Sequence, residues 1–193
     1  MRVIAGTARG RPLRATASTR PTADLIKGSI FSMLEALAYK RGFEPDEEGA
    51  LAVALAWPRV LDLFAGSGAL GIEALSRGAT SVTFIDSDRE AARVIESNLR
   101  ATDVAERATV LLGSVSLTLQ RMREPVDLVF ADPPYHDAAA LHESVQCLAG
   151  LLLPTSVAVL EQPAPAEPPA AVGPLRLSRT RTHGGTRISL YAG

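Results

Sequence analysis

The chain has 193 residues, of which 47% are hydrophobic, and a formal net charge of −1 at pH 7. This composition is typical of a globular protein and argues against the disordered and membrane-embedded classes, because no apolar run approaches the ~18 residues needed to span a bilayer. The single cysteine, Cys147, can form no internal disulfide, and no hydrophobic segment follows the first charged residues. We therefore expect a cytoplasmic protein. The three histidines show no ligand spacing, so no metal site is expected.

The charge is unevenly distributed along the chain. Residues 1–28 hold six basic side chains and one acid, a net charge of +5, whereas the remaining 165 residues carry −6. A basic segment on an acidic body is typical of a polyanion-binding protein, although a merely solvated terminal segment would look the same. The basic side chains expected to contact nucleic acid are Arg2, Arg9, Arg11, Arg14 and Arg20.

Two parts of the chain differ in their patterns. Residues 1–20 contain short β-type pieces broken by Gly and Pro, which suggests a hairpin, and a helix is predicted over 23–41 with Thr22 as its cap. We expect residues 1–41 to form a basic hairpin and helix appended to a main domain of residues 42–193. Residues 42–57 form a connection whose structure the sequence does not define.

A regular alternation of strands and helices begins after Pro58. Strands are predicted at 59–64, 81–85, 108–112, 126–131 and 156–161, and helices at 69–77, 88–101, 115–123 and 138–149. This alternation favours an α/β domain with a parallel sheet covered on both faces. Residues 162–174 are rich in Pro and Ala and are predicted to form a loop, and the tail is predicted to form an antiparallel hairpin around residues 183–185.

A glycine-rich turn lies between the first predicted strand and its helix. Gly66, Gly68 and Gly71 form the pattern G-x-G-x-x-G, and Asp86 follows Gly66 by 20 residues at the end of the next strand. Such glycines allow a tight turn and close approach of a ligand to the backbone, and a carboxylate at that distance can bind ribose hydroxyls. The pattern therefore predicts a nucleoside cofactor.

Asp62 bears on which cofactor is bound. This acid precedes the glycine turn and would repel the pyrophosphate of a nicotinamide dinucleotide, and no Lys-Ser/Thr pair follows the glycines as in a P-loop. S-adenosylmethionine has no phosphate and carries an ammonium and a sulfonium cation. Unit charges ~4 Å apart interact by roughly 4 kcal/mol at an effective dielectric constant near 20. Electrostatics therefore favours S-adenosylmethionine.

The stretch "DPPY" ends the fourth predicted strand, which lies next to the first in a doubly wound sheet. We expect the Asp132 carboxylate and the Pro133 carbonyl to accept hydrogen bonds from the two N–H groups of an exocyclic amine. The prolines add no competing donors and hold the carbonyls rigidly, and Tyr135 could stack on an extruded base. The motif therefore predicts methyl transfer to an amine, in which alignment matters more than a strong base.

"DLFAGSGALGIEALSRGA" followed by "DPPY" resembles the Rossmann-type amino methyltransferases. Together with "MRVIAGTARGRPL", "TRPTAD" and the terminal "GGTRISLY", it resembles the bacterial family that methylates N2 of a guanine in small-subunit (16S) ribosomal RNA. This resemblance implies a Rossmann-like class I methyltransferase with a seven-stranded, mostly parallel sheet and a C-terminal antiparallel hairpin. It also implies S-adenosylmethionine as cofactor and small-subunit rRNA as partner, either free or within an assembling 30S particle; we further expect a monomer.

The resemblance also assigns site residues. The expected cofactor-binding residues are Asp62, Phe64, Gly66, Ser67, Gly68, Asp86, Ser87, Ser114 and Asp132. The expected catalytic residues are Asp132, Pro133, Pro134 and Tyr135. The chain departs from the family pattern at residues 25–28, where Arg-x-Arg-Glu is typical and Gly28 replaces the glutamate, and at Ser114, where an acid often meets the adenine amine.

Other functions share some of these features. An adenine-N6 methyltransferase acting on DNA or RNA would use the same chemistry, but the short chain leaves little room for the target-recognition domain that sequence-specific DNA modification needs. A non-catalytic RNA-binding assembly factor could retain the fold, although the intact "DPPY" argues against it. A nicotinamide-dependent oxidoreductase is disfavoured by Asp62.

Overall fold

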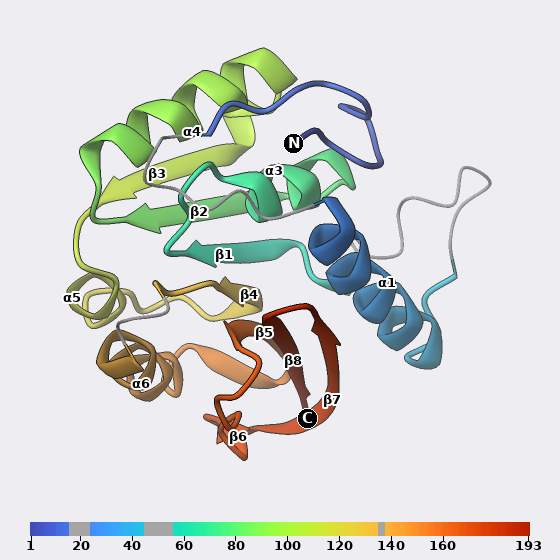
Figure 1. The fold of residues 1–193 in the computed structure, drawn as a ribbon, viewed down its shortest axis with the longest axis vertical. Helices are drawn as coiled ribbons and strands as arrows, with labels where there is room; N and C mark the ends of the chain where they lie inside the picture. The colour runs from blue at the N-terminus through green and yellow to red at the C-terminus, as the bar shows by residue number, and fades with distance from the viewer. Residues whose placement is uncertain (16–23, 45–55, 135–137) are drawn as a thin grey trace.

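The computed structural model describes residues 1–15, 24–44, 56–134 and 138–193, with the side chains of residues 138–140 left out. Its centre is one mixed sheet of eight strands in the order β3-β2-β1-β4-β5-β8-β7-β6 (Figure 1). The strands are β1 Arg59–Leu63, β2 Ser81–Asp86, β3 Ala108–Leu112, β4 Val126–Ala131, β5 Leu152–Pro163, β6 Ala171–Val172, β7 Leu175–His183 and β8 Thr186–Ala192. The first five pair in parallel and the last three are antiparallel. This is an α/β fold with a mostly parallel sheet, as the alternation predicts, and its strand order is Rossmann-like, as the resemblance implies.

The expectation of seven strands was wrong. The eighth strand, β6, lies within residues 162–174, which were predicted to form a loop, and it pairs Ala171 and Val172 with β7. Val172 is fully buried in the apolar cluster beneath α6, so tertiary packing rather than local propensity makes this short strand. Strand β5 also extends beyond its predicted range at both ends.

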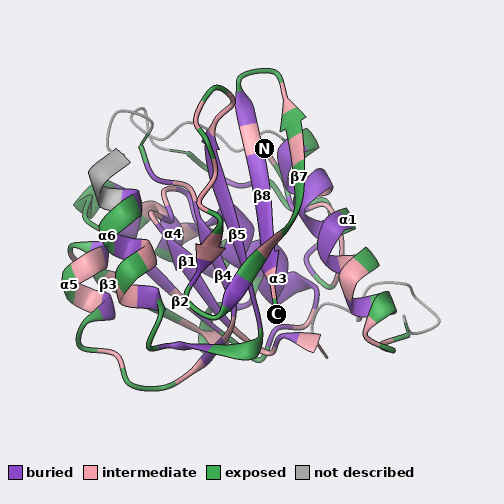
Figure 2. Cartoon of the chain, turned by 90° about the horizontal axis from the view of Figure 1, so that it is seen from below, coloured by how far each residue is buried: buried purple, intermediate pink, exposed green. Residues whose placement is uncertain are grey.

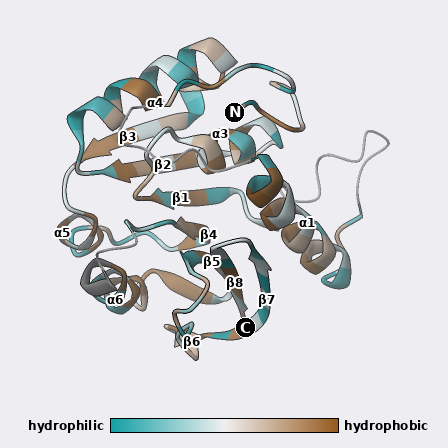
Figure 3. Ribbon diagram, in the orientation of Figure 1, coloured by the Kyte–Doolittle hydropathy of each residue, from teal (hydrophilic) through white to brown (hydrophobic). Residues whose placement is uncertain are grey.

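Helices cover both faces of the sheet, as expected. They are α1 Asp24–Lys40, α3 Ala69–Ser76, α4 Arg89–Thr102, α5 Val115–Leu119 and α6 Ala138–Leu148. Helices α1, α3 and α4 pack on one face of the sheet, and α5 and α6 pack on the other (Figures 1 and 2). Each face has its own apolar cluster. Hydrophilic and hydrophobic residues alternate along α4, as expected of a helix with one face exposed (Figure 3). Helix α5 is shorter than predicted, and no helix among the described residues is long and apolar enough to cross a membrane.

The N-terminal segment, residues 1–15, folds back on itself and packs against α3. Its two pieces meet at one antiparallel bridge between Arg2 and Pro12. Val3, Ala8 and Leu13 are buried in the same apolar cluster as α1, α3 and α4. This segment therefore contributes to the core of the main domain as well as carrying basic side chains.

Candidate functional site

The glycine loop and the "DPP" stretch meet at one edge of the sheet. The strand order changes direction between β1 and β4, which makes this pair the topological switch point. Leu63 and Ala131 are paired at the ends of these two strands, and the backbone N–H of Asp132 lies 3.5 Å from the carbonyl oxygen of Leu63. The predicted cofactor loop and the predicted amine site are thus adjacent across one pair of parallel strands.

The chain turns sharply directly after β1. Phe64 has a φ of 57°, an unusual conformation for a bulky residue, and Gly66 and Gly68 have φ values of 55° and 75°. Backbone strain of this kind is typical of functional loops, where the surrounding structure must hold it in place. The loop ends at Gly68, where α3 begins.

Asp86 holds the glycine loop from the neighbouring strand. Its Oδ2 accepts the N–H of Gly66 at 2.7 Å, and its Oδ1 accepts the N–H of Asp88 at 2.9 Å. Asp88 in turn caps α4 by accepting the N–H of Glu90. Each carboxylate oxygen of Asp86 has a second lone pair, so the side chain can still accept hydrogen bonds from a ligand.

Asp62 is a buried carboxyl beneath the loop. It accepts the backbone N–H of Gly71 at 2.8 Å. Burial raises the pKa of Asp62 to about 8, the Gly71 hydrogen bond opposes this rise, and the carboxylates of Asp132 and Asp86 add to it. The carboxylates of Asp86 and Asp132, at the ends of the two strands that neighbour β1, therefore both act on Asp62, and the three acids together favour a cationic ligand.

The third glycine of the motif packs against the sheet. A Cβ atom at Gly71 would lie 2.3 Å from Cε1 of Phe84 and 2.9 Å from Cγ1 of Val82. Only glycine fits at this crossing of α3 and β2, so Gly71 serves the close packing of helix on strand. The residue after Gly71 is Ile72, so the loop lacks the lysine of a phosphate-binding loop.

The three candidate serines differ in their surroundings. Ser67 is buried, and its Oγ lies 3.9 Å from Sδ of Met1. Ser87 is exposed beside Asp86. Ser114 is exposed at the start of α5, with its Oγ 3.2 Å from Oγ of Ser116, and the preceding Gly113 donates its N–H to the backbone carbonyl of Asp86. Ser114 therefore lies at the same sheet edge as Asp86.

The proposed amine site begins at Asp132, directly after β4. Asp132 is half-buried, Pro133 is buried and Pro134 is exposed. Tyr135 lies outside the described residues. Among the described residues, no group of three or more His, Cys, Asp or Glu side chains has the arrangement of a metal site.

Comparison with known proteins agrees with this geometry. Residues 1–192 match the family model described as "Conserved hypothetical protein 95". The Bacillus subtilis protein named "Putative rRNA methyltransferase YlbH" is 35% identical, with 99% of this chain and 98% of that protein covered. Ribosomal RNA small subunit methyltransferase D of Haemophilus influenzae is 32% identical, with 83% of this chain and 78% of that protein covered. This chain belongs to the ribosomal RNA small subunit methyltransferase D family.

A solved structure supports the same assignment. The Escherichia coli protein described as "Putative methyltransferase yhhF" is 31% identical and superposes with a TM-score of 0.79, with 99% of this chain and 96% of that chain covered. The likeness includes the N-terminal segment, so this member of the methyltransferase D family shares more than the Rossmann-like core.

The basic residues predicted to contact nucleic acid lie on the N-terminal segment of this family member. Arg2, Arg9, Arg11 and Arg14 are all exposed. Arg2 Nε is 4.0 Å from Oδ2 of Asp24, and Arg11 Nη1 donates to the carbonyl of Ala101 at 2.9 Å. The fifth, Arg20, is outside the described part of the chain.

Sequence reasoning missed Asn98, which joins the N-terminal segment to the glycine loop. Its Nδ2 donates to the carbonyls of Arg14 and Ser67, both at 2.9 Å, and its Oδ1 accepts the N–H of Arg14 at 2.9 Å. The signal was present in the sequence, because Asn98 follows Ile95 and Ala91 on the buried face of α4. A polar residue in such an apolar stripe needs buried partners.

Proposed function

We propose that this protein transfers a methyl group from S-adenosylmethionine to the exocyclic N2 of a guanine in small-subunit rRNA. The observation that carries the proposal is the adjacency of the glycine loop and Asp132 across the ends of β1 and β4. A methyl donor held by the loop and an amine held by Asp132 would then face one another, and such alignment is the main requirement for this reaction.

The loop and its acids suit this cofactor. We propose that Asp62, Gly66 and Gly68 hold the methionine part of the cofactor, whose cationic groups are attracted by the neighbouring carboxylates. Asp86 is proposed to accept hydrogen bonds from the ribose hydroxyls. Phe64, Ser67, Ser87 and Ser114 complete the pocket, with Ser114 near the adenine. When bound, S-adenosylmethionine supplies an electrophilic methyl group on a sulfonium sulfur.

Asp132 and Pro133 are proposed to hold the target amine. The lone pair of a base amine is delocalised into the ring, so the nitrogen is a poor nucleophile until it becomes pyramidal. Hydrogen bonds from its two N–H groups to the Asp132 carboxylate and the Pro133 carbonyl would favour that geometry and direct the lone pair away from them. Pro133 and Pro134 carry no N–H to compete, and Tyr135 would stack on the base.

Support for the rRNA substrate comes from the family and from charge. Two relatives carry rRNA methyltransferase names, and the exposed arginines of the N-terminal segment suit a polyanion. The choice of guanine N2 rests on the family resemblance. Adenine N6 is the alternative for the same amine-holding site.

Labelled methyl transfer to small-subunit rRNA, followed by mass spectrometry of the nucleosides, tests the proposal. We expect the label in N2-methylguanosine, and we expect none with large-subunit rRNA. Running free transcript and 30S particles in parallel identifies the physical form of the substrate. Label in N6-methyladenosine would support the alternative, and transfer to neither RNA would reject both.

A further inference from the structure

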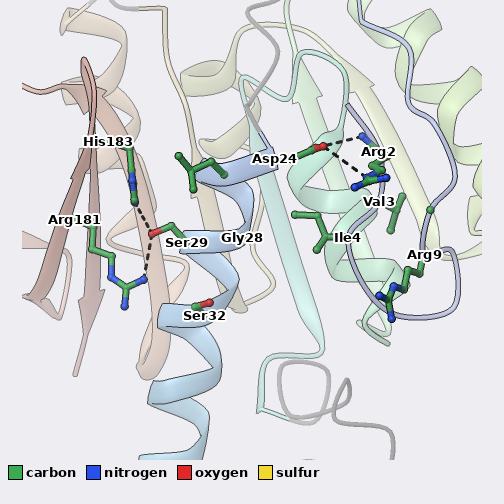
Figure 4. A pocket seen from close by; sticks show the side chains of 12 residues that line it. Arg2, Val3, Ile4, Arg9, Asp24, Gly28, Ser29, Ser32, Arg181 and His183 are labelled. Carbon is green, nitrogen blue, oxygen red and sulfur yellow. Dashed lines mark hydrogen bonds and ion pairs between the residues drawn. The ribbon is translucent and has the colours of Figure 1, made fainter.

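A polar cavity lies beside the first two turns of α1, between the N-terminal segment and the tip of the β7–β8 hairpin (Figure 4). Its volume is about 640 Å3. Leu25, Gly28, Ser29 and Ser32 line it from α1, and their spacing places them on one side of that helix. Three of these four residues are small, which leaves room for a ligand.

The walls of the cavity are basic. Arg2 and Arg9 line it from the N-terminal segment, and Arg181 and His183 line it from the end of β7. Among the described residues that line the cavity, Asp24 is the single acid and lies by Arg2, so these residues have a formal charge of +2 with His183 counted as neutral. A cavity with three guanidinium groups on two facing walls is suited to phosphate, which arginine binds through paired N–H donors.

Ser29 fixes the C-terminal wall against α1. Its Oγ lies 2.9 Å from Nε2 of His183 and accepts a hydrogen bond from Nη1 of Arg181 at 3.3 Å. Ser29 is buried, whereas Arg181 and His183 are half-buried. The two β7 side chains are thus held in place, and a ligand in the cavity would find the guanidinium already oriented.

The cavity lies at the edge of the sheet that carries the candidate methyl-transfer site. Thr186 pairs with both His183 and Pro163, so the hairpin tip lies at the carboxyl end of β5. Asp132 follows β4, and β4 and β7 are three inter-strand spacings apart, about 14 Å. On the other wall, the N-terminal segment reaches the glycine loop through Met1 and Ser67.

We propose that this cavity binds backbone phosphates of the RNA that flank the target nucleotide, with Arg181 as a specific contact. This inference rests on the proposed function, and it adds the C-terminal hairpin to the surface that contacts the RNA. Arg2 and Arg9 bind from the opposite wall, so the strand is held between the two ends of the chain.

Arg181→Gln tests the contact, and Arg176→Gln is its matched control. Arg176 is an exposed arginine at the other end of β7. We expect Arg181→Gln to weaken binding of a small-subunit rRNA transcript by about fivefold to tenfold and to lower the slope of log Kd against log salt by about 0.7–0.9. Arg176→Gln should leave both values unchanged, and both variants should keep wild-type affinity for S-adenosylmethionine.

Gly28 offers a second test, in which charge is added to the cavity. Among the described residues, a Cβ atom at Gly28 would meet only Cδ1 of Ile4, at 3.9 Å. Glutamate and glutamine, the two replacements used, both have a higher helix propensity than glycine. Gly28→Glu should weaken RNA binding by about tenfold, because this chain has Leu25 where the family pattern has an arginine that could balance a glutamate at position 28. The uncharged Gly28→Gln of the same size should weaken binding much less.

Two results would overturn the proposal. One is an RNA affinity and salt slope for Arg181→Gln equal to those of Arg176→Gln. The other is unchanged affinity for the free transcript with weakened binding to 30S particles, which would assign the cavity to a ribosomal protein. Because methyl transfer and cofactor affinity of the wild type are measured separately, a failure of the proposed function is distinguishable from a failure of the cavity.

Discussion

The ammonium of Lys27 and the carboxylate of Glu73 lie 3.2 Å apart, and neither side chain is exposed to solvent. The same carboxylate accepts the backbone N–H groups of Ile4 and Ala5, at 2.8 and 2.9 Å, and forms a second ion pair with Arg77. One buried acid on α3 therefore holds both α1 and the N-terminal segment against that helix. A buried ion pair of this kind positions its elements, and it is costly to break on one side only.

We predict that Glu73→Gln lowers the free energy of unfolding by about 3–5 kcal/mol, because it leaves the Lys27 ammonium buried without its counter-charge. Urea denaturation measures the change. Glu96→Gln is the control, since the ion pair of Glu96 with Arg100, at 4.0 Å, is exposed, and this substitution should cost less than about 0.5 kcal/mol. Equal effects of the two substitutions would contradict this role for Glu73.

Asn98→Ala should weaken the binding of S-adenosylmethionine. The substitution removes the donor to the Ser67 carbonyl in the cofactor loop and both bonds to the Arg14 backbone, so we expect about a fivefold to tenfold rise in Kd together with some loss of stability. Isothermal titration calorimetry measures the Kd, with Glu96→Gln on the same helix as control. A destabilised variant that keeps wild-type cofactor affinity would show that Asn98 supports the fold alone.

The sequence predicts those parts of the fold and of the candidate site that depend on local patterns. Strand and helix periodicity, the glycine spacing and the position of Asp86 are all encoded within about 20 residues, and the structure brings these elements together as expected. The pairing of Asn98 with Arg14 spans 84 residues and that of His183 with Ser29 spans 154, so no local pattern encodes them.

Strand β6 was missed for a related reason. Its two residues form a strand only because Val172 is buried under α6. The burial of Lys27 could not be predicted from the sequence either, because a lysine normally lies on the solvated face of a helix. Its ammonium is buried here because it pairs with Glu73 on another helix.

The pKa of Asp62 predicts a pH dependence of cofactor binding. With a pKa of about 8, Asp62 is mostly protonated at pH 6, and a cationic ligand favours its ionised form. We therefore expect the affinity for S-adenosylmethionine to rise between pH 6 and 7.5, with release of a proton that calorimetry in buffers of different ionisation enthalpy can detect. Asp62→Asn should bind more weakly and lose this dependence.

The raised pKa of Asp62 also affects the stability of the unliganded protein. The folded-state pKa of Asp62 is raised, so its contribution to stability is complete below about pH 4 and is lost as the pH rises toward 8. Asp62→Asn should therefore raise the Tm at pH 8.5 by at least about 3 °C while it lowers cofactor affinity. A Tm that falls in this variant at pH 8.5 would contradict the assignment.

Gly71→Ala should destabilise the protein by about 1–3 kcal/mol, because its Cβ would overlap the fully buried ring of Phe84. Gly150→Ala is the control, since a Cβ atom there meets no atom of the described residues within 4 Å. Urea denaturation compares the two. If Gly71→Ala were as stable as Gly150→Ala, the close packing of α3 on β2 would not be what requires glycine.

The most direct test of the central claim, that the glycine loop and Asp132 form one methyl-transfer site, is single-turnover methyl transfer to small-subunit rRNA by Asp132→Ala. Cofactor and RNA affinities are measured on the same samples. We predict a rate at least about 100-fold below that of the wild type, with both affinities changed far less, because the amine loses an acceptor that aligns it. An Asp132→Ala protein that transfers methyl groups at the wild-type rate would contradict the account.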